Sequence, residues 1–411
     1  METQDDEARR SRSGFLQTLD RWGRGRVSIW ILAATVGIGI YAQAAFYLFT
    51  TVRTRDSYSY YYAAVALRKG LDPYDRVALN SLAPDRVGYV MPYLYPPAFA
   101  QAWSPLIALS PEAAHSTVVA VSTLLALLNV AILWSLLPRP PNQGVWLLAF
   151  LALHAVCGPV VSAVRLGQIT VLLGTLIFGS LALERARHSG PAGALFSLAC
   201  LTKVTPVLFV FDLIARRRWL TIASFTGVTL LLVASSVFTI GPEPWRRFLE
   251  IMAQPKPFEP LMSMHGLLAH AFGKDPSSAW AVEVAWGVSA LALFLVVVRL
   301  LKRDGKNGDP VKNWSVLTLF GLLASPMTWH HHYYLALLPF SYLVFREQTP
   351  RLRAIAVAVA LLALLRYPGS LHYLKPLCAI AGLALLGLAP HPALVDGPPP
   401  ETPAALLRGS A

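Results

Sequence analysis

Side chains suited to catalysis stand in four short clusters between long apolar stretches of this chain. In the first cluster, Asp56 follows an apolar stretch by six residues and is flanked by Arg53 and Arg55. A carboxylate beside apolar surface is a candidate general base. A solvated aspartate beside an aromatic belt at a membrane interface is the structural alternative. The aromatic residues that suggest such a belt are Tyr58, Tyr60, Tyr61 and Tyr62.

Two further clusters carry groups that bind sugars or phosphate. Arg165 and Gln168 stand in the segment RLGQIT at the junction of two apolar stretches, where they serve either as ligands or as a helix cap. Lys203 stands in TKVTP between two short apolar segments. An ionisable residue inside an apolar block is costly and is a functional candidate by default, and a lysine suits phosphate as a point charge. A lysine that snorkels to the membrane interface is the alternative.

The fourth cluster is a run of three histidines, His330, His331 and His332, inside ASPMTWHHHYYLALLP. On a helix, successive side chains diverge by about 100°, and side chains converge only at a spacing of three or four residues. The run therefore favours one histidine that faces a polar cavity as a hydrogen-bond donor. It argues against a metal centre built from all three.

The composition identifies the class of protein that must position these clusters. Of 411 residues, 55% are hydrophobic and only 14% are charged, whereas a soluble domain carries roughly 25% charged residues. The net charge of +13 comes from basic residues that sit in short groups between apolar blocks, which argues against nucleic-acid binding. The cysteines, Cys157, Cys200 and Cys378, show no metal or redox spacing. The sequence predicts an all-α polytopic membrane protein.

A membrane span needs about 20 apolar residues, and the apolar stretches predict a helical bundle with about ten crossings. Segment 96–109 is too short and is predicted to be re-entrant or interfacial. Segments 191–202 and 205–215 are predicted to be half-length helices that form a hairpin. The ten predicted spans are 28–50, 113–136, 145–164, 168–184, 219–241, 279–301, 314–328, 331–346, 352–367 and 372–389.

The basic residues orient this bundle. The segments assigned to the cytoplasm hold 21 Lys and Arg, those assigned outside hold 14, and the short outer loops are nearly bare. Both termini are therefore expected in the cytoplasm, with loops 51–95 and 242–278 outside. The predicted division is a cytoplasmic segment 1–27, a membrane catalytic domain 28–389 and a disordered cytoplasmic tail 390–411.

All four clusters then lie at the outer face of the membrane. A transporter more often places its polar residues near the bilayer midplane. Chemistry at one face therefore favours an enzyme that acts on a lipid-linked substrate. A transporter or flippase for a lipid-linked or small solute is the alternative.

The clusters, taken in order, resemble glycosyltransferase family 87 over about residues 50 to 345. The position between Trp329 and His331 is often acidic in that family, and here it is His330. The matching motifs are Asp56, Tyr61-Tyr62, Gly70 to Tyr74, Tyr95-Pro96-Pro97, Gly167-Gln168, Lys203 to Pro206, and Ser325-Pro326 with Trp329 and His331.

The resemblance implies an integral membrane enzyme of the GT-C type in the plasma membrane. Such an enzyme moves a sugar, typically mannose, from a polyprenyl-phosphate donor to a lipid or glycan acceptor with inversion. Asp56 is then the expected general base. The donor phosphate is expected to bind His331, Lys203 and Arg165, and the sugar is expected to contact Gln168, Tyr95, Tyr61 and Trp329. No cofactor and no metal ligand are expected, although the GT-C superfamily contains members that use a divalent metal. Membrane lipids are the other expected partners.

Overall fold

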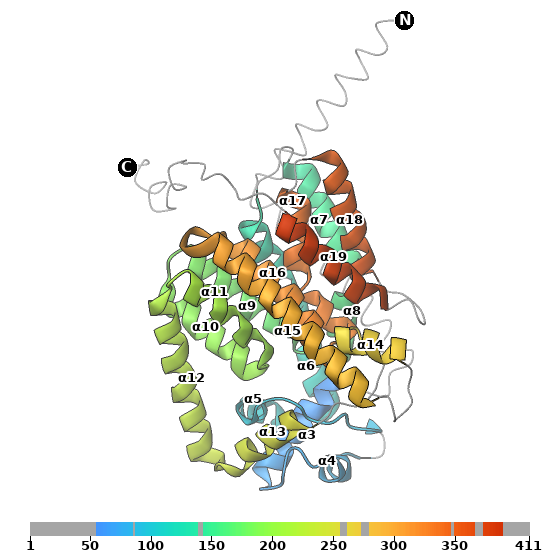
Figure 1. The fold of residues 1–411 in the computed structure, drawn as a ribbon. Coiled ribbons are helices and arrows are strands. Elements are labelled where there is room, and N and C mark those ends of the chain that lie inside the picture. Colours follow the sequence, from blue (N-terminus) through green and yellow to red (C-terminus); the bar gives the residue numbers. More distant parts are fainter. Residues whose placement is uncertain are drawn as a thin grey trace, which may run out of the picture.

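The computed structural model describes residues 55–84, 87–138, 143–254, 261–272, 279–346, 349–365 and 373–388. Every regular element within these ranges is a helix, which confirms the predicted all-α class (Figure 1). The predicted span 28–50 and the terminal segments 1–27 and 390–411 lie outside the described residues.

Three described helices are long and apolar enough to cross a membrane: α6 (Pro111–Leu136), α12 (Trp219–Ile240) and α15 (Ala279–Asp304). A fourth candidate is α8 (Gly158–Leu166) together with α9 (Thr170–Arg185), which meet at a bend of 119°. In α12 and α15, only 11% of the most apolar stretch is buried inside the protein. Long apolar helices with exposed flanks indicate a membrane protein.

The predicted count of about ten crossings is not confirmed. Several of the predicted spans are helices of 14 or 15 residues, namely α7 (Gln143–Val156), α16 (Pro310–Ala324), α18 (Pro350–Leu364) and α19 (Leu374–Leu388). A helix of 15 residues is about 22 Å long, shorter than the roughly 30 Å hydrocarbon core. Predicted span 145–164 is divided at Cys157 into α7 and α8, and a proline at the second position of α8 starts the new helix.

Predicted span 331–346 is also divided. It begins with the 3-10 helix η6 (His330–Tyr334), and the regular helix α17 (Leu337–Arg346) follows. Helix α16 ends at Ala324 because Ser325 precedes Pro326 and adopts an extended conformation. The histidine run therefore lies on a short, tight turn between two helices.

The two predicted half-length helices are present, with the break at the predicted position. Helix α10 (Ser189–Thr202) ends at Lys203, which is extended (φ −154°, ψ 134°), and is followed by η3 (Thr205–Phe209) and α11 (Val210–Ala215). A short turn joins α9 to α10, and the two helices pack side by side. The chain therefore runs away from the start of α9 and returns to it at Lys203.

A layer of short helices covers one end of the bundle, at the bottom of Figure 1. Its members are α3 (Asp56–Arg68), α4 (Arg76–Leu82), α5 (Pro97–Ala102), η2 (Ser104–Ala108) and α13 (Glu243–Ala253). These helices share an aromatic core separate from the main one. Arg247 of α13 pairs with Asp72 at 3.0 Å, so the predicted outer loops 51–95 and 242–278 meet here. The helix α14 (Met264–Phe272) packs against α15 and α16.

Candidate active site

Asp56 is the first residue of α3, and a side-chain amide holds its carboxylate. Nε2 of Gln168 donates a hydrogen bond to Oδ2 of Asp56 at 2.6 Å. The hydroxyl of Tyr60, one helical turn after Asp56, donates to Oε1 of Gln168 at 2.9 Å. Tyr60 is fully buried. The amide is therefore fixed at both ends and presents its N–H group to Asp56.

A glycine turn brings Gln168 to this position. Gly167 ends α8 in the left-handed conformation (φ 63°, ψ 37°), which favours glycine. A Cβ atom there would lie 2.9 Å from Nδ1 of His115 and 2.9 Å from the side chain of Ser57. His115 and Ser57 are themselves hydrogen-bonded at 2.7 Å. The bare Gly167 backbone therefore allows α8, α6 and the start of α3 to meet at Asp56.

The surroundings of Asp56 tune its acidity. Burial raises the pKa of Asp56 to about 6, although the hydrogen bond from Gln168 and the charge of Lys203 both lower it. A carboxylate with a pKa near neutrality is suited to accept a proton at physiological pH. Asp56 lies outside the candidate membrane spans.

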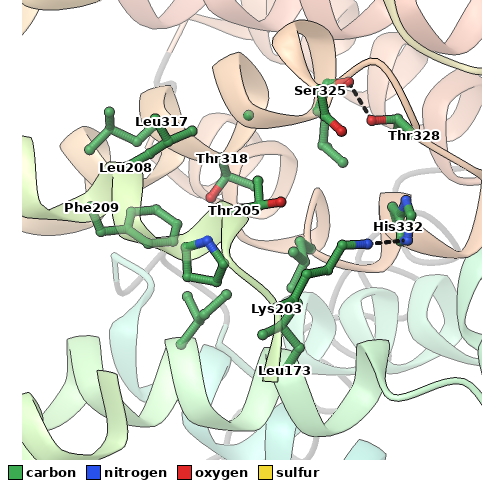
Figure 2. A pocket seen from close by; sticks show the side chains of 15 residues that line it. Leu173, Lys203, Thr205, Leu208, Phe209, Leu317, Thr318, Ser325, Thr328 and His332 are labelled. Atoms are coloured by element: carbon green, nitrogen blue, oxygen red, sulfur yellow. Dashed lines mark hydrogen bonds between the residues drawn. The ribbon is translucent and has the colours of Figure 1, made fainter. Parts of the chain in front are cut away.

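Lys203 and His332 form the second part of the site (Figure 2). Nζ of Lys203 lies 2.6 Å from Nε2 of His332. The backbone N–H of Trp329 donates to the other ring nitrogen of His332, Nδ1, at 3.0 Å. Burial lowers the pKa of Lys203 to about 7, and the charge of Asp56 opposes this shift. The mutual electrostatic influence of Asp56 and Lys203 joins the two parts into one site.

An apolar pocket adjoins this pair of nitrogen atoms. Figure 2 shows Lys203 and His332 at the pocket, with apolar side chains and a few hydroxyl-bearing ones, such as Thr205 and Thr318, on its other walls. The apolar lining includes Leu173, Ile177, Leu208, Phe209, Leu317 and Leu335. A cation and an imidazole beside an apolar pocket can bind an anionic group that carries a hydrocarbon chain.

The structure brings several of the sequence-predicted residues together. Gln168 contacts Asp56 directly, and Lys203 acts on it electrostatically. Tyr95 is connected to Gln168 through Tyr60, because the hydroxyls of Tyr95 and Tyr60 lie 3.2 Å apart. His331 is buried beside the pair, with its ring 4.4 Å from that of His332.

Other predicted residues lie differently. The Tyr61 hydroxyl donates to the backbone carbonyl of Leu109 at 2.8 Å, which anchors α3 to the end of η2 and directs Tyr61 away from Gln168. Trp329 contributes its backbone N–H to His332. Arg165 is half-buried on the last turn of α8.

Tyr60 and His332 belong to the site although sequence reasoning did not select them. The spacing of four residues between Asp56 and Tyr60 is a usable signal, since residues at that spacing share a helix face. The histidine run carried no such signal, because His332 differs from its neighbours in the contacts that it makes with Lys203 and with the backbone N–H of Trp329.

The acidic residues of segment 71–75 have structural partners. Asp75 accepts from the backbone N–H of Val77 at 2.8 Å and caps α4. Asp72 accepts from the backbone N–H of Tyr74 at 2.9 Å and pairs with Arg247. Within the described residues, no three His, Cys, Asp or Glu side chains are grouped so that they could hold a metal ion.

The model of glycosyltransferase family 87 matches residues 93–326. The chain belongs to glycosyltransferase family 87. No solved structure matches the chain.

The curated relatives of this family 87 chain are mycobacterial enzymes. One is a polyprenol-phosphate-mannose-dependent alpha-(1-2)-phosphatidylinositol mannoside mannosyltransferase of Mycolicibacterium smegmatis, 27% identical over 270 residues. Its counterpart in Mycobacterium tuberculosis is 26% identical over 273 residues. A polyprenol-phosphate-mannose-dependent alpha-(1-2)-phosphatidylinositol pentamannoside mannosyltransferase of M. smegmatis is 26% identical over 250 residues. The matches cover 60% of this chain, and the chain spans about 60% of the length of each relative.

Proposed function

We propose that this protein is a membrane glycosyltransferase that moves mannose from a polyprenyl-phosphate donor to a lipid or glycan acceptor. The observation that carries the proposal is the arrangement of a carboxylate held by an amide, Asp56 with Gln168, and a lysine–imidazole pair, Lys203 with His332, beside an apolar pocket. Asp56 and Lys203 act on each other electrostatically. The named relatives use polyprenol-phosphate mannose, which supports this donor and favours sugar transfer over transport.

The proposed reaction is a single in-line displacement. Asp56 removes the proton of the acceptor hydroxyl, and the resulting oxygen attacks the anomeric carbon of the donor sugar. The bond from that carbon to the phosphate oxygen breaks, and the polyprenyl phosphate leaves with the bonding electron pair. Because the attack comes from the face opposite the leaving group, the configuration inverts. A positioned base contributes about 10²–10⁴-fold to such a rate.

The leaving phosphate needs donors that stabilise its charge. Protonated Lys203 supplies one, and His331 and Arg165 are the further groups that the sequence assigns to this role. Gln168 holds Asp56 in place through its amide, and Tyr95 is available to orient the sugar. A divalent ion is not needed for this chemistry.

The apolar pocket gives the isoprenoid chain of the donor a place to lie. Leu208, Leu317 and Leu335 line the pocket beside Lys203, so a phosphate held by Lys203 has its first isoprene units against hydrocarbon. The relatives act on phosphatidylinositol mannosides, and we propose an acceptor of the same chemical class, a lipid-linked glycan with a free sugar hydroxyl.

We propose that the active site lies at the outer face of a multi-pass plasma-membrane protein with cytoplasmic termini. The support is the distribution of Lys and Arg along the chain, together with the packing of segments 55–84 and 243–253 in one layer.

Purified protein and radiolabelled short-chain polyprenyl-phosphate mannose test this function. The protein is mixed with membrane lipid extracts as acceptors, and transfer of label to a lipid product is the expected result. In sealed vesicles, movement of the intact donor across the membrane without any transfer would contradict the proposal and support a flippase.

A further inference from the structure

A backbone group fixes the protonation pattern of the His332 ring. The Trp329 N–H donates to Nδ1 of His332 at 3.0 Å. A backbone N–H is only a donor, so Nδ1 must be the nitrogen that accepts and that carries no proton. In a neutral imidazole the proton then resides on Nε2. Burial lowers the pKa of His332 well below its usual range. The neutral ring is therefore the form expected near neutral pH.

The N–H group at Nε2 of His332 points at Lys203, and the two nitrogen atoms lie 2.6 Å apart (Figure 2). An ammonium group has three donors and no lone pair, so it cannot accept this hydrogen bond. A neutral amine can accept it. Burial lowers the pKa of Lys203 to about 7, so the amine form is accessible at physiological pH.

We propose that at mildly alkaline pH Lys203 is a neutral amine in the donor-free protein, that His332 is a further ligand of the donor phosphate, and that donor binding at that pH takes up one proton. The inference rests on the proposed function and adds to it a residue and a coupled protonation. A phosphodiester anion between Lys203 and His332 replaces their mutual hydrogen bond. Lys203 takes a proton from solvent and becomes an ammonium, and both nitrogens then donate to phosphate oxygens. His332 keeps its Nε2 proton throughout.

The described titratable groups that interact electrostatically with Lys203 are Asp56 from α3 and His331 and His332 from η6. Tyr95, before α5, interacts in turn with Asp56. Burial raises the pKa of Tyr95, so it stays neutral across the working range. Burial lowers the pKa of His331, so this ring is also neutral at pH 8. Asp56 has a pKa of about 6 and is the one other group that can take up a proton when an anion binds. An Asp56→Asn variant removes that contribution.

Isothermal titration calorimetry of the full-length protein with short-chain polyprenyl-phosphate mannose measures the protons taken up. The donor is a phosphodiester and does not titrate between pH 6 and pH 8. Titrations at one pH in two buffers with different ionisation enthalpies give the number of protons per donor bound. We expect close to one proton at pH 8, in the wild type and in Asp56→Asn alike. At pH 6 the uptake should be smaller in Asp56→Asn, where only Lys203 can contribute. The donor Kd should weaken by up to about tenfold per pH unit above pH 7.

Three variants test whether Lys203 takes up the proton and whether His332 binds the phosphate. Lys203→Arg carries a permanent charge, so it should bind donor with no proton uptake at pH 8. His332→Phe keeps a ring but lacks the N–H donor, and should weaken donor binding at pH 6 by about tenfold or more. His330→Gln, in the same turn, is the matched control and should show the wild-type uptake and affinity.

Donor binding and transfer without proton uptake at pH 8 would overturn the inference and leave the proposed function standing. Wild-type uptake in Lys203→Arg, or unchanged donor affinity in His332→Phe, would overturn it as well. A protein that binds no donor at either pH would instead overturn both the inference and the proposed function.

Discussion

Carboxylates near the two ends of α9 have opposite kinds of partner. At the end of α9, Glu184 is 2% exposed and accepts hydrogen bonds from Arg218 and Thr221. Asp212 of α11 is fully buried nearby, and accepts from Arg216 at 2.9 Å, Asn313 at 2.7 Å and Trp314 at 2.9 Å. Each carboxylate there has an arginine partner in addition to neutral donors.

The start of α9 lies about 21 Å along the helix from Glu184. Near that end, Asp56 accepts a hydrogen bond from the side-chain amide of Gln168. Among the described residues, no Lys or Arg forms an ion pair with Asp56, and Lys203 acts on it only from a distance. Paired charges of the first kind hold helices together. A carboxylate that is desolvated, held by a neutral amide and left without a cation keeps its capacity to take a proton. The comparison separates carboxylates that pair with arginines from the carboxylate proposed as the catalytic base.

Asp56→Asn should have the largest effect on catalysis. Asparagine keeps the shape of the side chain but cannot act as the base, so kcat should fall about 10²–10⁴-fold, while expression and donor Kd stay close to wild type. Asp212→Asn is the contrasting change. It leaves Arg216 with a weaker buried partner, so the yield of folded protein should fall while the kcat of the surviving protein stays near normal. Radiolabel transfer measures kcat, and size-exclusion profiles measure the yield of folded protein. A normal kcat in Asp56→Asn, or a strongly reduced kcat in well-folded Asp212→Asn, would contradict the difference in role between the two carboxylates.

Lys203→Met should follow in size. Methionine keeps most of the side-chain length but supplies no charge to the phosphate, so kcat/KM should fall about 10²–10³-fold. Arg246→Met is the control, because Arg246 is exposed on α13 and pairs there with Glu243 and Glu250. Its kcat/KM should stay within about twofold of wild type, as expected for an exposed ion pair. Equal losses in both variants would point to a general requirement for positive charge in place of a specific phosphate ligand.

Gly167→Ala should have an intermediate effect. The added Cβ meets His115 and Ser57 at 2.9 Å and is strained in the left-handed backbone. Gln168 and Asp56 then shift relative to each other, and a displacement of about 1 Å costs up to about 10²-fold in rate. Gly241→Ala tests backbone strain alone, because φ there is 78° and no atom lies near its Cβ position. Transfer rates that fall equally in both variants would remove the positioning role of Gly167.

Tyr60→Phe should have the smallest effect on kcat of these variants, and it should still differ from that of the neighbouring variant Tyr61→Phe. It removes the donor to the Gln168 carbonyl oxygen, and the loosened amide should lower kcat about threefold to tenfold. Tyr61→Phe removes only the bond to the Leu109 carbonyl and should change kcat by less than about twofold. Steady-state transfer assays with matched protein amounts measure both, and a larger loss in Tyr61→Phe would return Tyr61 to the site.

Much of the site followed from sequence because it depends on local breaks in apolar segments. Lys203 interrupts an apolar stretch and is followed two residues later by Thr205-Pro206, so both the break between α10 and η3 and the presence of an ionisable side chain there were predictable. Asp56 and Gln168 stand at helix termini, where polar side chains are common and their positions can be read from the sequence. Their meeting at 2.6 Å was not predictable, because it depends on the Gly167 turn against α6.

The number of spans and the choice of histidine needed the structure. Hydropathy averages over a window and does not register short interruptions. One is at Cys157, which divides predicted span 145–164, and another is at Ser325, which ends α16 inside predicted span 314–328. The histidine run adopts a 3-10 turn, in which successive side chains diverge by about 120°. Which of them meets Lys203 is decided by how η6 packs against α8 and α9, and that packing is not encoded in the local pattern.

The pH dependence of kcat/KM most directly tests the proposed roles of Asp56 as the base and of protonated Lys203 as the phosphate ligand. Asp56, with its pKa raised to about 6, is protonated and inactive as a base below that pH, so kcat/KM should fall about tenfold per unit as the solution becomes more acidic. Lys203, with its pKa lowered to about 7, loses its charge above that pH, so kcat/KM should fall again as the solution becomes more basic. The account predicts a narrow maximum between pH 6 and pH 7, measured with a non-titrating phosphodiester donor. A profile that is flat from pH 5 to pH 9, or that rises steadily above pH 8, would contradict it.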